Sequence, residues 1–310
     1  MKKNKAMIVT FLAPALFMFI MVFLYPICRT VVMSFFKIEG ITDSFSKWQF
    51  TGIDNYVKLM NTTLFKTSMW NLFRIWFIGG IIVMSLALLF AVILTSGIRF
   101  KSFFRAMIYL PNVVSAVALA TMWLQYVYNN QYGLLSGVFK KLGLTSLAKI
   151  QWLDSDHKFY ALLFAYCFGM VGYHMLIFAS GIERISEDYY EAATLDGANK
   201  LGQFRYITLP LLKGVFKTNI TMWSVTSVGF FVWSQLFSSV TADNQTITPM
   251  VYLYMQIFGA GNSVTERNSG LGAAVGVMLS VCVVLIFWLC NHLLKGDDLE
   301  FEKEGTLWRK

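Results

Sequence analysis

The chain has 310 residues, of which 56% are hydrophobic and 14% are charged, whereas soluble proteins average roughly 45–50% and about 25%. These proportions exclude a soluble enzyme and indicate a polytopic membrane protein, because each spanning helix needs about 20 mainly apolar residues. The formal net charge is +9, but the basic residues cluster beside apolar segments, so we expect no nucleic-acid partner.

Long apolar segments predict an all-α transmembrane helical bundle with six spans. In chain order the spans cover residues 8–36, 75–95, 106–128, 159–182, 214–240 and 271–294. Because six is even, both termini are expected on one side of the membrane. In the last segment Gly272 and Gly276 form a small-xxx-small pair, which favours close helix packing.

The distribution of Lys and Arg predicts the orientation, since cytoplasmic flanks retain positive charge. The N-terminus, segments 96–105 and 183–217, and the C-terminal tail hold fifteen basic residues, whereas the longer opposite loops hold ten. We therefore expect a cytoplasmic N-terminus (residues 1–7), a transmembrane domain (8–294), a cytoplasmic loop (183–213) and a cytoplasmic tail (295–310). The expected location is a membrane that the chain crosses several times, with lipid as a partner.

Ionisable groups inside the predicted spans are few. None of the 17 Asp and Glu residues falls within a span, and His174 is the one imidazole deep in one. Ion-coupled carriers use intramembrane carboxylates, so the sequence argues against a secondary transporter. The four cysteines lack metal-ligand spacing, and we expect neither a metal site nor catalytic residues.

The loop between the fourth and fifth spans reads as two short helices. Ser186 is a predicted N-cap, and Glu187 and Asp188 follow in the first turn, where carboxylates favour the helix dipole. Gly197 predicts a bend, since glycine takes left-handed dihedrals without steric cost. The second helix is expected to place Leu201, Phe204 and Ile207 on one apolar stripe before Pro210 ends it. Docking on a protein and lying on the membrane both remain open for this pair.

The same loop resembles the signature Glu-Ala-Ala-x3-Gly-x9-Ile-x-Leu-Pro of the membrane subunits of binding-protein-dependent ABC importers. Segments 50–56 (FTGIDNY) and 105–111 (RAMIYLP) are similar to maltose-type sugar permeases. Where many such permeases carry Thr-x-Gly-Gly-Pro, this chain has TADNQ at 241–245. The residues that match the loop signature are Glu191, Ala192, Ala193, Gly197, Ile207, Leu209 and Pro210.

The resemblance implies that these seven residues couple the chain to a separate ATPase, whose two copies use ATP and Mg. It also implies that residues 8–294 are an ABC permease domain in a bacterial plasma (inner) membrane. The implied partners are a second permease subunit, forming a heterodimer, and an extracellular sugar-binding protein. No Gly-Lys pair occurs in the chain, so it lacks a Walker A phosphate loop and needs no cofactor of its own.

Aromatic and polar residues near the middle of spans four and five are candidates for sugar binding. Aromatic faces can stack on sugar rings while hydroxyl and imidazole groups pair with sugar hydroxyls. The candidates are Tyr173, His174, Trp223, Ser227 and Phe230. The predicted function is thus an ATP-driven importer permease for oligosaccharides or related sugars. An ABC permease for a non-sugar solute and a non-transport membrane interaction protein remain as alternatives.

Overall fold

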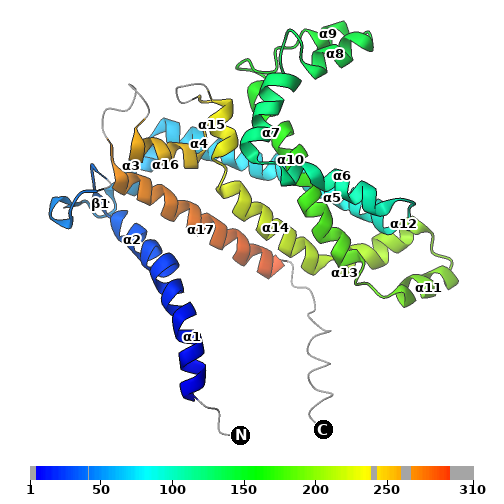
Figure 1. Ribbon diagram of the computed structural model, residues 1–310, viewed down its shortest axis with the longest axis horizontal. Helices are drawn as coiled ribbons and strands as arrows, with labels where there is room; N and C mark the ends of the chain where they lie inside the picture. The colour runs from blue at the N-terminus through cyan, green and yellow to red at the C-terminus, as the bar shows by residue number, and fades with distance from the viewer. Residues whose placement is uncertain (1–4, 41, 239–242, 260–266, 294–310) are drawn as a thin grey trace. The chain divides into compact units, whose positions relative to one another are not determined.

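The computed structural model describes residues 5–40, 42–238, 243–259 and 267–293, and its helices divide between two compact units. Unit 1 comprises residues 1–69 and 240–281, and unit 2 comprises 70–239 and 282–310. Two helices run from one unit into the other, α4 (Thr63–Arg74) and α17 (Ser269–Leu293) (Figure 1). The predicted tail and part of segment 241–245 lie outside the described residues.

Unit 1 holds the first apolar helix and a small loop region. Its elements are α1 (Lys5–Phe19), η1 (Ile20–Leu24), α2 (Tyr25–Met33), β1 (Phe36–Lys37), η2 (Phe45–Lys47), β2 (Gln49–Phe50), α3 (Asp54–Asn61) and α16 (Pro249–Phe258). The two strands pair antiparallel, with Phe36 opposite Phe50.

Buried amides fasten both α3 and the start of α17 to the segment after α2. The Asn55 amide donates to the carbonyls of Ser34 and Phe36, both at 2.9 Å, and the Ser269 amide donates to the Ile38 carbonyl at 2.7 Å. A Cβ at Gly270 would lie 1.8 Å from the Phe36 carbonyl oxygen, so this approach requires glycine.

Unit 2 contains the remaining described elements. They are η3 (Ile75–Gly79), α5 (Gly80–Thr95), α6 (Lys101–Val113), α7 (Ala116–Met122), η4 (Trp123–Val127), α8 (Leu134–Lys141), α9 (Thr145–Ala148), α10 (Lys158–Ile182), α11 (Glu187–Leu195), α12 (Lys200–Gln203), η5 (Phe204–Thr208), α13 (Leu209–Leu211), α14 (Lys213–Val228) and α15 (Val232–Phe237).

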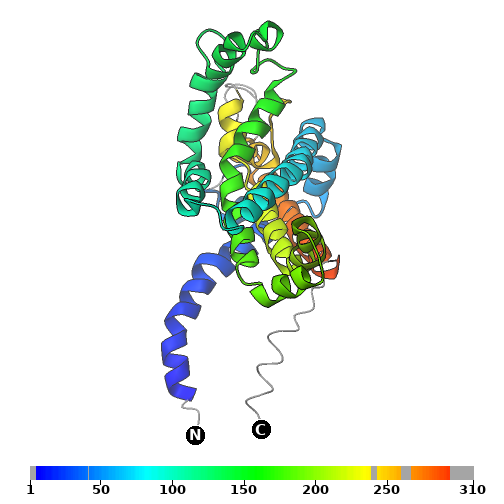
Figure 2. The same ribbon diagram turned by 90° about the vertical axis from the view of Figure 1, so that its right-hand side faces the viewer.

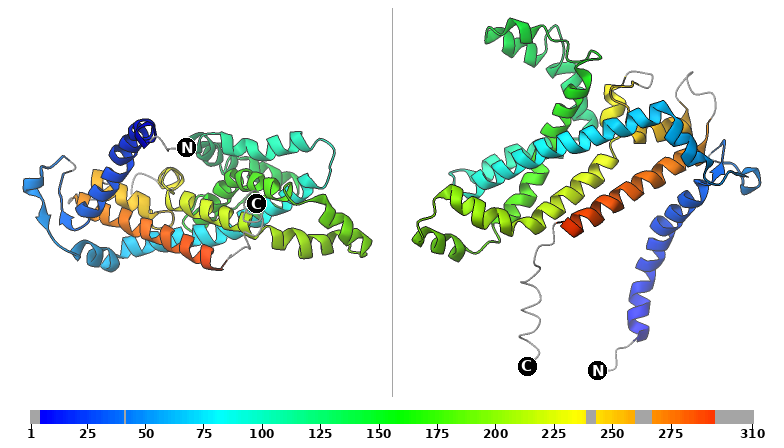
Figure 3. Two further views of the ribbon diagram at one scale, coloured as in Figure 1. Left: turned by 90° about the horizontal axis from the view of Figure 1, so that it is seen from below. Right: turned by 180° about the vertical axis from the view of Figure 1, so that it is seen from behind.

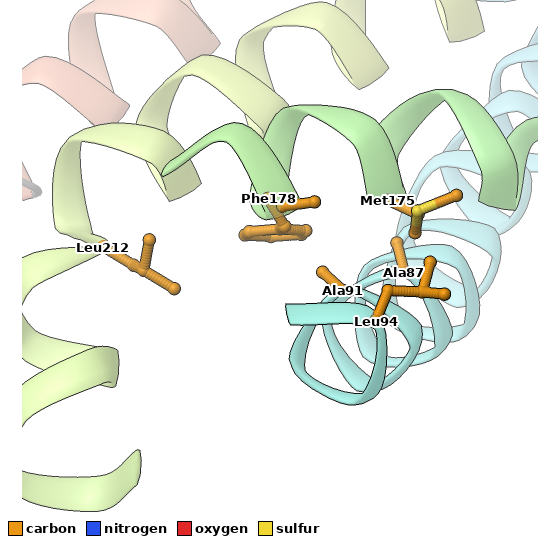
Figure 4. Close-up of a cluster of buried hydrophobic side chains, with 7 residues drawn as sticks. Ala87, Ala91, Leu94, Met175, Phe178 and Leu212 are labelled. Atoms are coloured by element: carbon orange, nitrogen blue, oxygen red, sulfur yellow. The ribbon is translucent and has the colours of Figure 1, made fainter. Parts of the chain in front are cut away.

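Helix α10 is the centre of unit 2, where it packs on α5, α6 and α14 (Figure 2). Small residues Ala87 and Ala91 on α5 let Met175 and Phe178 of α10 approach closely, and Leu212 closes the same cluster (Figure 4). A Cβ at Gly172 would meet the Ile108 carbonyl oxygen at 2.3 Å, which explains how α6 lies against α10.

Four helices of the described chain are long and apolar enough to cross a membrane, and the number rises to five if a bent pair of helices counts as one span. They are Val9–Met33, Thr63–Thr95, Lys158–Ile182 and Ser269–Leu293, and the bent pair is Lys101–Val113 with Ala116–Val127. The prediction of a helical membrane bundle is therefore confirmed, whereas six spans and cytoplasmic termini stay predictions.

The helix that contains the second predicted span already begins at Thr63, before residue 75, and is 33 residues long. Its first turns include Lys66, Ser68 and Asn71, and these polar residues hid the helix from a search for apolar runs. The first span ends at Met33 rather than at residue 36, because Phe36 enters β1.

The third predicted span is not one straight helix, since α6 and α7 differ in direction by 96°. Pro111 lies in the last turn of α6, Val114 is extended, and the Ser115 hydroxyl caps α7 by accepting from the Ala118 amide. The fifth predicted span is broken after Val228, so α14 has only 16 residues and α15 follows as a separate helix.

Glycine on α17 serves helix packing, as the small-xxx-small pattern predicts. A Cβ at Gly272 would lie 2.8 Å from the Ile257 side chain, which places α16 directly against this face. Gly276 is less constrained, because its nearest side-chain atom, on Leu253, is 3.8 Å away.

Candidate functional site

The loop between α10 and α14 folds as the sequence predicts at its start and at its bend. The Ser186 hydroxyl accepts from the Asp188 amide at 3.4 Å and begins α11. Gly197 has φ of +82°, in the left-handed region that favours glycine, and it ends the first helix. Asn199 then caps α12 through a 2.8 Å bond from the Gly202 amide.

A buried glutamine joins the two halves of this loop. Gln203 donates from Nε2 to the Thr194 hydroxyl at 2.8 Å and to the Tyr190 carbonyl at 3.4 Å. The Tyr190 hydroxyl lies 2.9 Å from the Thr208 hydroxyl. The helices of the loop are therefore fixed to each other by side-chain hydrogen bonds across the bend.

The predicted apolar stripe of the second helix does not form one face. Leu201 is 72% exposed, whereas Phe204 and Ile207 are half-buried, because the helix widens into a π-type turn at η5. Pro210 does not end this helix, since it lies in α13, which follows η5 without a break. The chain then passes into α14 within two residues.

The seven signature residues lie mostly on the surface of the loop. Glu191, Ala192, Gly197, Leu209 and Pro210 are exposed, and Ala193 and Ile207 are half-buried. Beside them Leu195 is 90% exposed, although its side chain is wholly apolar. We call Leu195 and Leu201 the exposed leucine pair, and no described residue of unit 2 covers either side chain.

Both ends of the loop are anchored to the helices that carry it. Glu183, just after α10, accepts from Arg105 of α6 at 2.7 Å and lies 3.8 Å from the Lys101 ammonium. At the other end Leu212 is fully buried in the cluster with Phe178. Between the loop and the ends of α5 and α6 lies an open cavity of about 1030 Å³, lined in part by Lys101, Glu191 and Lys200.

Four of the five candidate sugar-binding residues form one chain of ring contacts with Tyr166. His174 lies 5.1 Å from Tyr173 and 5.8 Å from Trp223 between ring centroids. Tyr166 connects Trp223 at 5.5 Å to Phe230 at 4.6 Å. Ser227, on α14, is fully buried. The side chains of His174, Trp223 and Phe230 are buried to within a few per cent, and Tyr173 is half-buried.

Hydrogen bonding distinguishes the members of this cluster. The Trp223 indole donates to the Trp76 carbonyl at 2.8 Å, and its ring lies against Gly79 and Gly80, so it holds α14 against η3. His174 Nδ1 lies 2.7 Å from the Asn219 side-chain oxygen. Among the described residues, His174 Nε2 and Asn219 Nδ2 are buried without a protein partner.

Residues 84–296 match the family model described as "Binding-protein-dependent transport system inner membrane component". The match covers more than half of the chain and includes the whole loop. The chain belongs to this family.

Relatives in this family extend along nearly the full chain. The chain is 29% identical over 305 residues to the arabinooligosaccharides transport system permease protein of Bacillus subtilis (strain 168), covering 97% of this chain and 91% of that protein. It is 27% identical over 310 residues to the diacetylchitobiose uptake system permease protein of Streptomyces coelicolor (strain ATCC BAA-471 / A3(2) / M145), covering 95% and 85%.

A solved structure shares the fold of this permease chain. It is a bacterial alginate ABC transporter in complex with an alginate pentasaccharide-bound periplasmic protein, with a TM-score of 0.75 and 18% identity. The likeness covers 94% of this chain and 95% of that one.

Several residues that hold the loop and the ring cluster together belong to no motif in the sequence. Gln203, Thr194 and Thr208 bind across the loop, and Asn219 pairs with His174, yet none of them belongs to a recognisable spacing. The one available indication of the pair was that Asn219 is an isolated Asn in a predicted span, 45 positions from the imidazole of His174 that it contacts.

Proposed function

We propose that this permease chain is half of the translocation pathway of an ATP-driven importer for oligosaccharides or related sugars. The two relatives described above are named for arabinooligosaccharides and diacetylchitobiose, which supports a sugar as the solute. The proposal includes six spans with cytoplasmic termini in a bacterial inner membrane, and a second permease subunit as a heterodimer partner. An external sugar-binding protein delivers the solute, and two ATPase subunits bind ATP and Mg.

The observation that carries the proposal is the exposed leucine pair on a rigid, anchored loop. Leu195 and Leu201 leave apolar area in water, and burial of such side chains against a partner is favourable by about 25 cal/mol per Å². The Gln203 hydrogen bonds keep the loop in one shape, and the bridge from Glu183 to Arg105 connects it to α6. Force applied to the loop by an ATPase subunit is thereby transmitted to α10 and α14.

Docking is tested by Leu195→Glu in the complex co-purified with the products of neighbouring genes. We expect less bound ATPase and loss of uptake at normal membrane levels, because a charge replaces the apolar contact. Met60→Glu is the matched control, since Met60 is 56% exposed on α3 in the other unit. Gly197→Pro and Glu191→Lys should uncouple uptake as well. Wild-type transport in all three loop variants would exclude the loop as the coupling element.

The solute site is proposed at the ring cluster around His174. Its aromatic rings offer stacking faces, and the unpaired nitrogens of His174 and Asn219 can pair with sugar hydroxyls. Because the cluster is buried in this structure, a sugar reaches it when α10 and α14 separate during transport.

This site is tested by Tyr173→Phe and His174→Gln, which change polar groups and keep most of the packing. We expect both to weaken sugar-stimulated ATP hydrolysis more than basal hydrolysis. Trp223→Ala is a less selective variant, because truncation of a packed aromatic costs roughly 3–5 kcal/mol in soluble cores. Unchanged sugar stimulation in Tyr173→Phe and His174→Gln would remove both residues from the site.

The energy source is tested in the same vesicles. Uptake should depend on ATP supplied to the partner subunits and should survive collapse of the proton gradient while ATP is maintained. Uncoupler-sensitive uptake at constant ATP would contradict the proposal.

A further inference from the structure

Helices α8 and α9 form a hairpin that projects from the N-terminal end of α10 (Figure 3). The Ser136 hydroxyl donates to the Ala148 carbonyl at 3.1 Å and closes the hairpin. At its base the Tyr128 hydroxyl donates to the Ala161 carbonyl at 2.8 Å, in the first turn of α10. Since α10 is long and apolar enough to span the membrane, the hairpin emerges at one boundary of the bilayer.

One face of α8 is apolar and exposed within unit 2. Leu134 is 63% exposed, Val138 is 42% exposed and Leu142 is 66% exposed. Leu134 and Val138 lie on the same side of α8, and Leu142, the residue that caps the helix, continues their spacing of four. We call these three residues the α8 stripe. Leu144 and Leu147, at 46% and 40% exposed, extend the apolar surface around the hairpin.

The hairpin is also uniformly basic. It carries Lys140, Lys141 and Lys149, and no Asp or Glu occurs anywhere between residues 129 and 153. An amphipathic helix with lysines beside an apolar face is the arrangement that lies in the headgroup region of an anionic membrane. Lysine stems can cover the acyl boundary while their ammonium groups remain among lipid phosphates.

We propose that the hairpin, residues 134–149, lies in the bilayer interface with the α8 stripe buried among anionic lipids. A lipid surface is favoured over a protein partner because the stripe contains no Trp, Tyr or Arg, the residues that dominate protein interfaces. The hairpin also lies beside the start of α10, at a boundary of the bilayer, and this position likewise favours a lipid surface. The proposal does not depend on the solute or on the ATPase, and with cytoplasmic termini the leaflet concerned is the outer one.

The test uses the full chain with its co-purified partners in nanodiscs of phosphatidylcholine and phosphatidylglycerol. Spin labels are attached to Leu134→Cys, Val138→Cys or Leu142→Cys in a background without the four native cysteines. Collision with oxygen, which concentrates in lipid, is compared with collision with a water-soluble nickel chelate. We expect oxygen to dominate at the α8 stripe.

Gly137→Cys is the matched control, because a Cβ at Gly137 meets nothing within 4 Å and lies beside the polar face. At this position the nickel chelate should dominate. A stripe as accessible to nickel as residue 137 would show that the hairpin is in water and would overturn the proposal. A stripe shielded from both reagents would overturn it in favour of a protein partner.

The charge contribution is tested by Lys140→Glu with Lys141→Glu, read from the label at residue 138. The preference for oxygen should shift toward nickel in anionic nanodiscs, and the wild-type preference should be weaker in phosphatidylcholine alone. An unchanged preference under both conditions would overturn the assignment of anionic lipid as the partner.

Discussion

Single buried side chains hold the loop between α10 and α14 in one shape, and Gln203 is the clearest example. It is 4% exposed and binds Thr194 and Tyr190 on the opposite side of the Gly197 bend. Ser186 and Gly197 are predictable, because capping and left-handed dihedrals select few residue types. Gln203 is not predictable, since a glutamine in a polar loop is normally solvated and the residue that fixes its position is distant in the sequence.

Removal of the Gln203 side chain should loosen the loop without unfolding the bundle. We expect Gln203→Ala to lose about 1–2 kcal/mol of local stability, since two hydrogen bonds disappear and the Thr194 hydroxyl loses a donor. Amides of α11 should then exchange with deuterium roughly tenfold faster, by mass spectrometry of the intact chain, because about 1.4 kcal/mol is a factor of ten in an opening equilibrium. Gln151→Ala, at an exposed glutamine, should leave these amides unchanged, and equal exchange in both variants would contradict this role.

At the scale of helices, glycine and alanine control which elements approach closely. Gly172 lets α10 lie against the backbone of α6, and Ala87 and Ala91 admit Phe178. The sequence predicted close packing at Gly272, where the pattern is a known one, but Gly172 follows no such pattern. Its partner helix starts 71 positions earlier, and only the folded bundle shows that the two backbones meet.

Gly172→Ala should therefore destabilise unit 2, whereas Gly214→Ala should not. The added methyl at residue 172 meets backbone atoms at 2.3 Å and 2.6 Å, which cannot move as a flexible side chain does, so a cost of about 1–3 kcal/mol is expected. At residue 214 nothing lies within 4 Å, and alanine in a helix gains up to about 1 kcal/mol over glycine.

The measurement for this pair is the midpoint of thermal unfolding in detergent, followed by fluorescence-detected size exclusion after heating. The midpoint should fall for Gly172→Ala and should stay or rise for Gly214→Ala. A similar fall in both variants would mean that helix propensity, rather than the contact with α6, determines the result.

At the scale of the whole molecule, composition predicted the class of protein and most of the spans. The differences between the predicted spans and the observed helices share one cause. Hydropathy reports whether a segment suits contact with lipid, and it does not report whether the helix is continuous. Helix α4 mixes polar and apolar residues and still continues into α5. In contrast, the apolar run 106–128 bends by 96°, and the run 214–240 breaks after Val228. A search for apolar windows therefore cannot decide whether these two segments cross the bilayer.

Cysteine labelling from outside intact cells decides the crossing of each such segment. In a background without native cysteines, cysteine replaces one residue at a time at Ser46, Gly137, Arg205 and Arg267. These positions are suitable because Ser46, Arg205 and Arg267 are exposed and Gly137 has open space for a side chain. With six spans and cytoplasmic termini, a membrane-impermeant maleimide should label positions 46, 137 and 267. Position 205 should react only after permeabilisation, which also serves as the control for total reactivity.

Each departure from this pattern identifies a different error. If the bent pair α6 and α7 does not cross, position 137 lies on the opposite side from position 46, since only the helix Thr63–Thr95 then separates them. If the broken α14 and α15 do not cross, positions 205 and 267 label alike. Reversal at all four sites would keep the six spans and overturn the orientation, because the fifteen basic residues of the predicted cytoplasmic segments would then face outward against the usual charge bias.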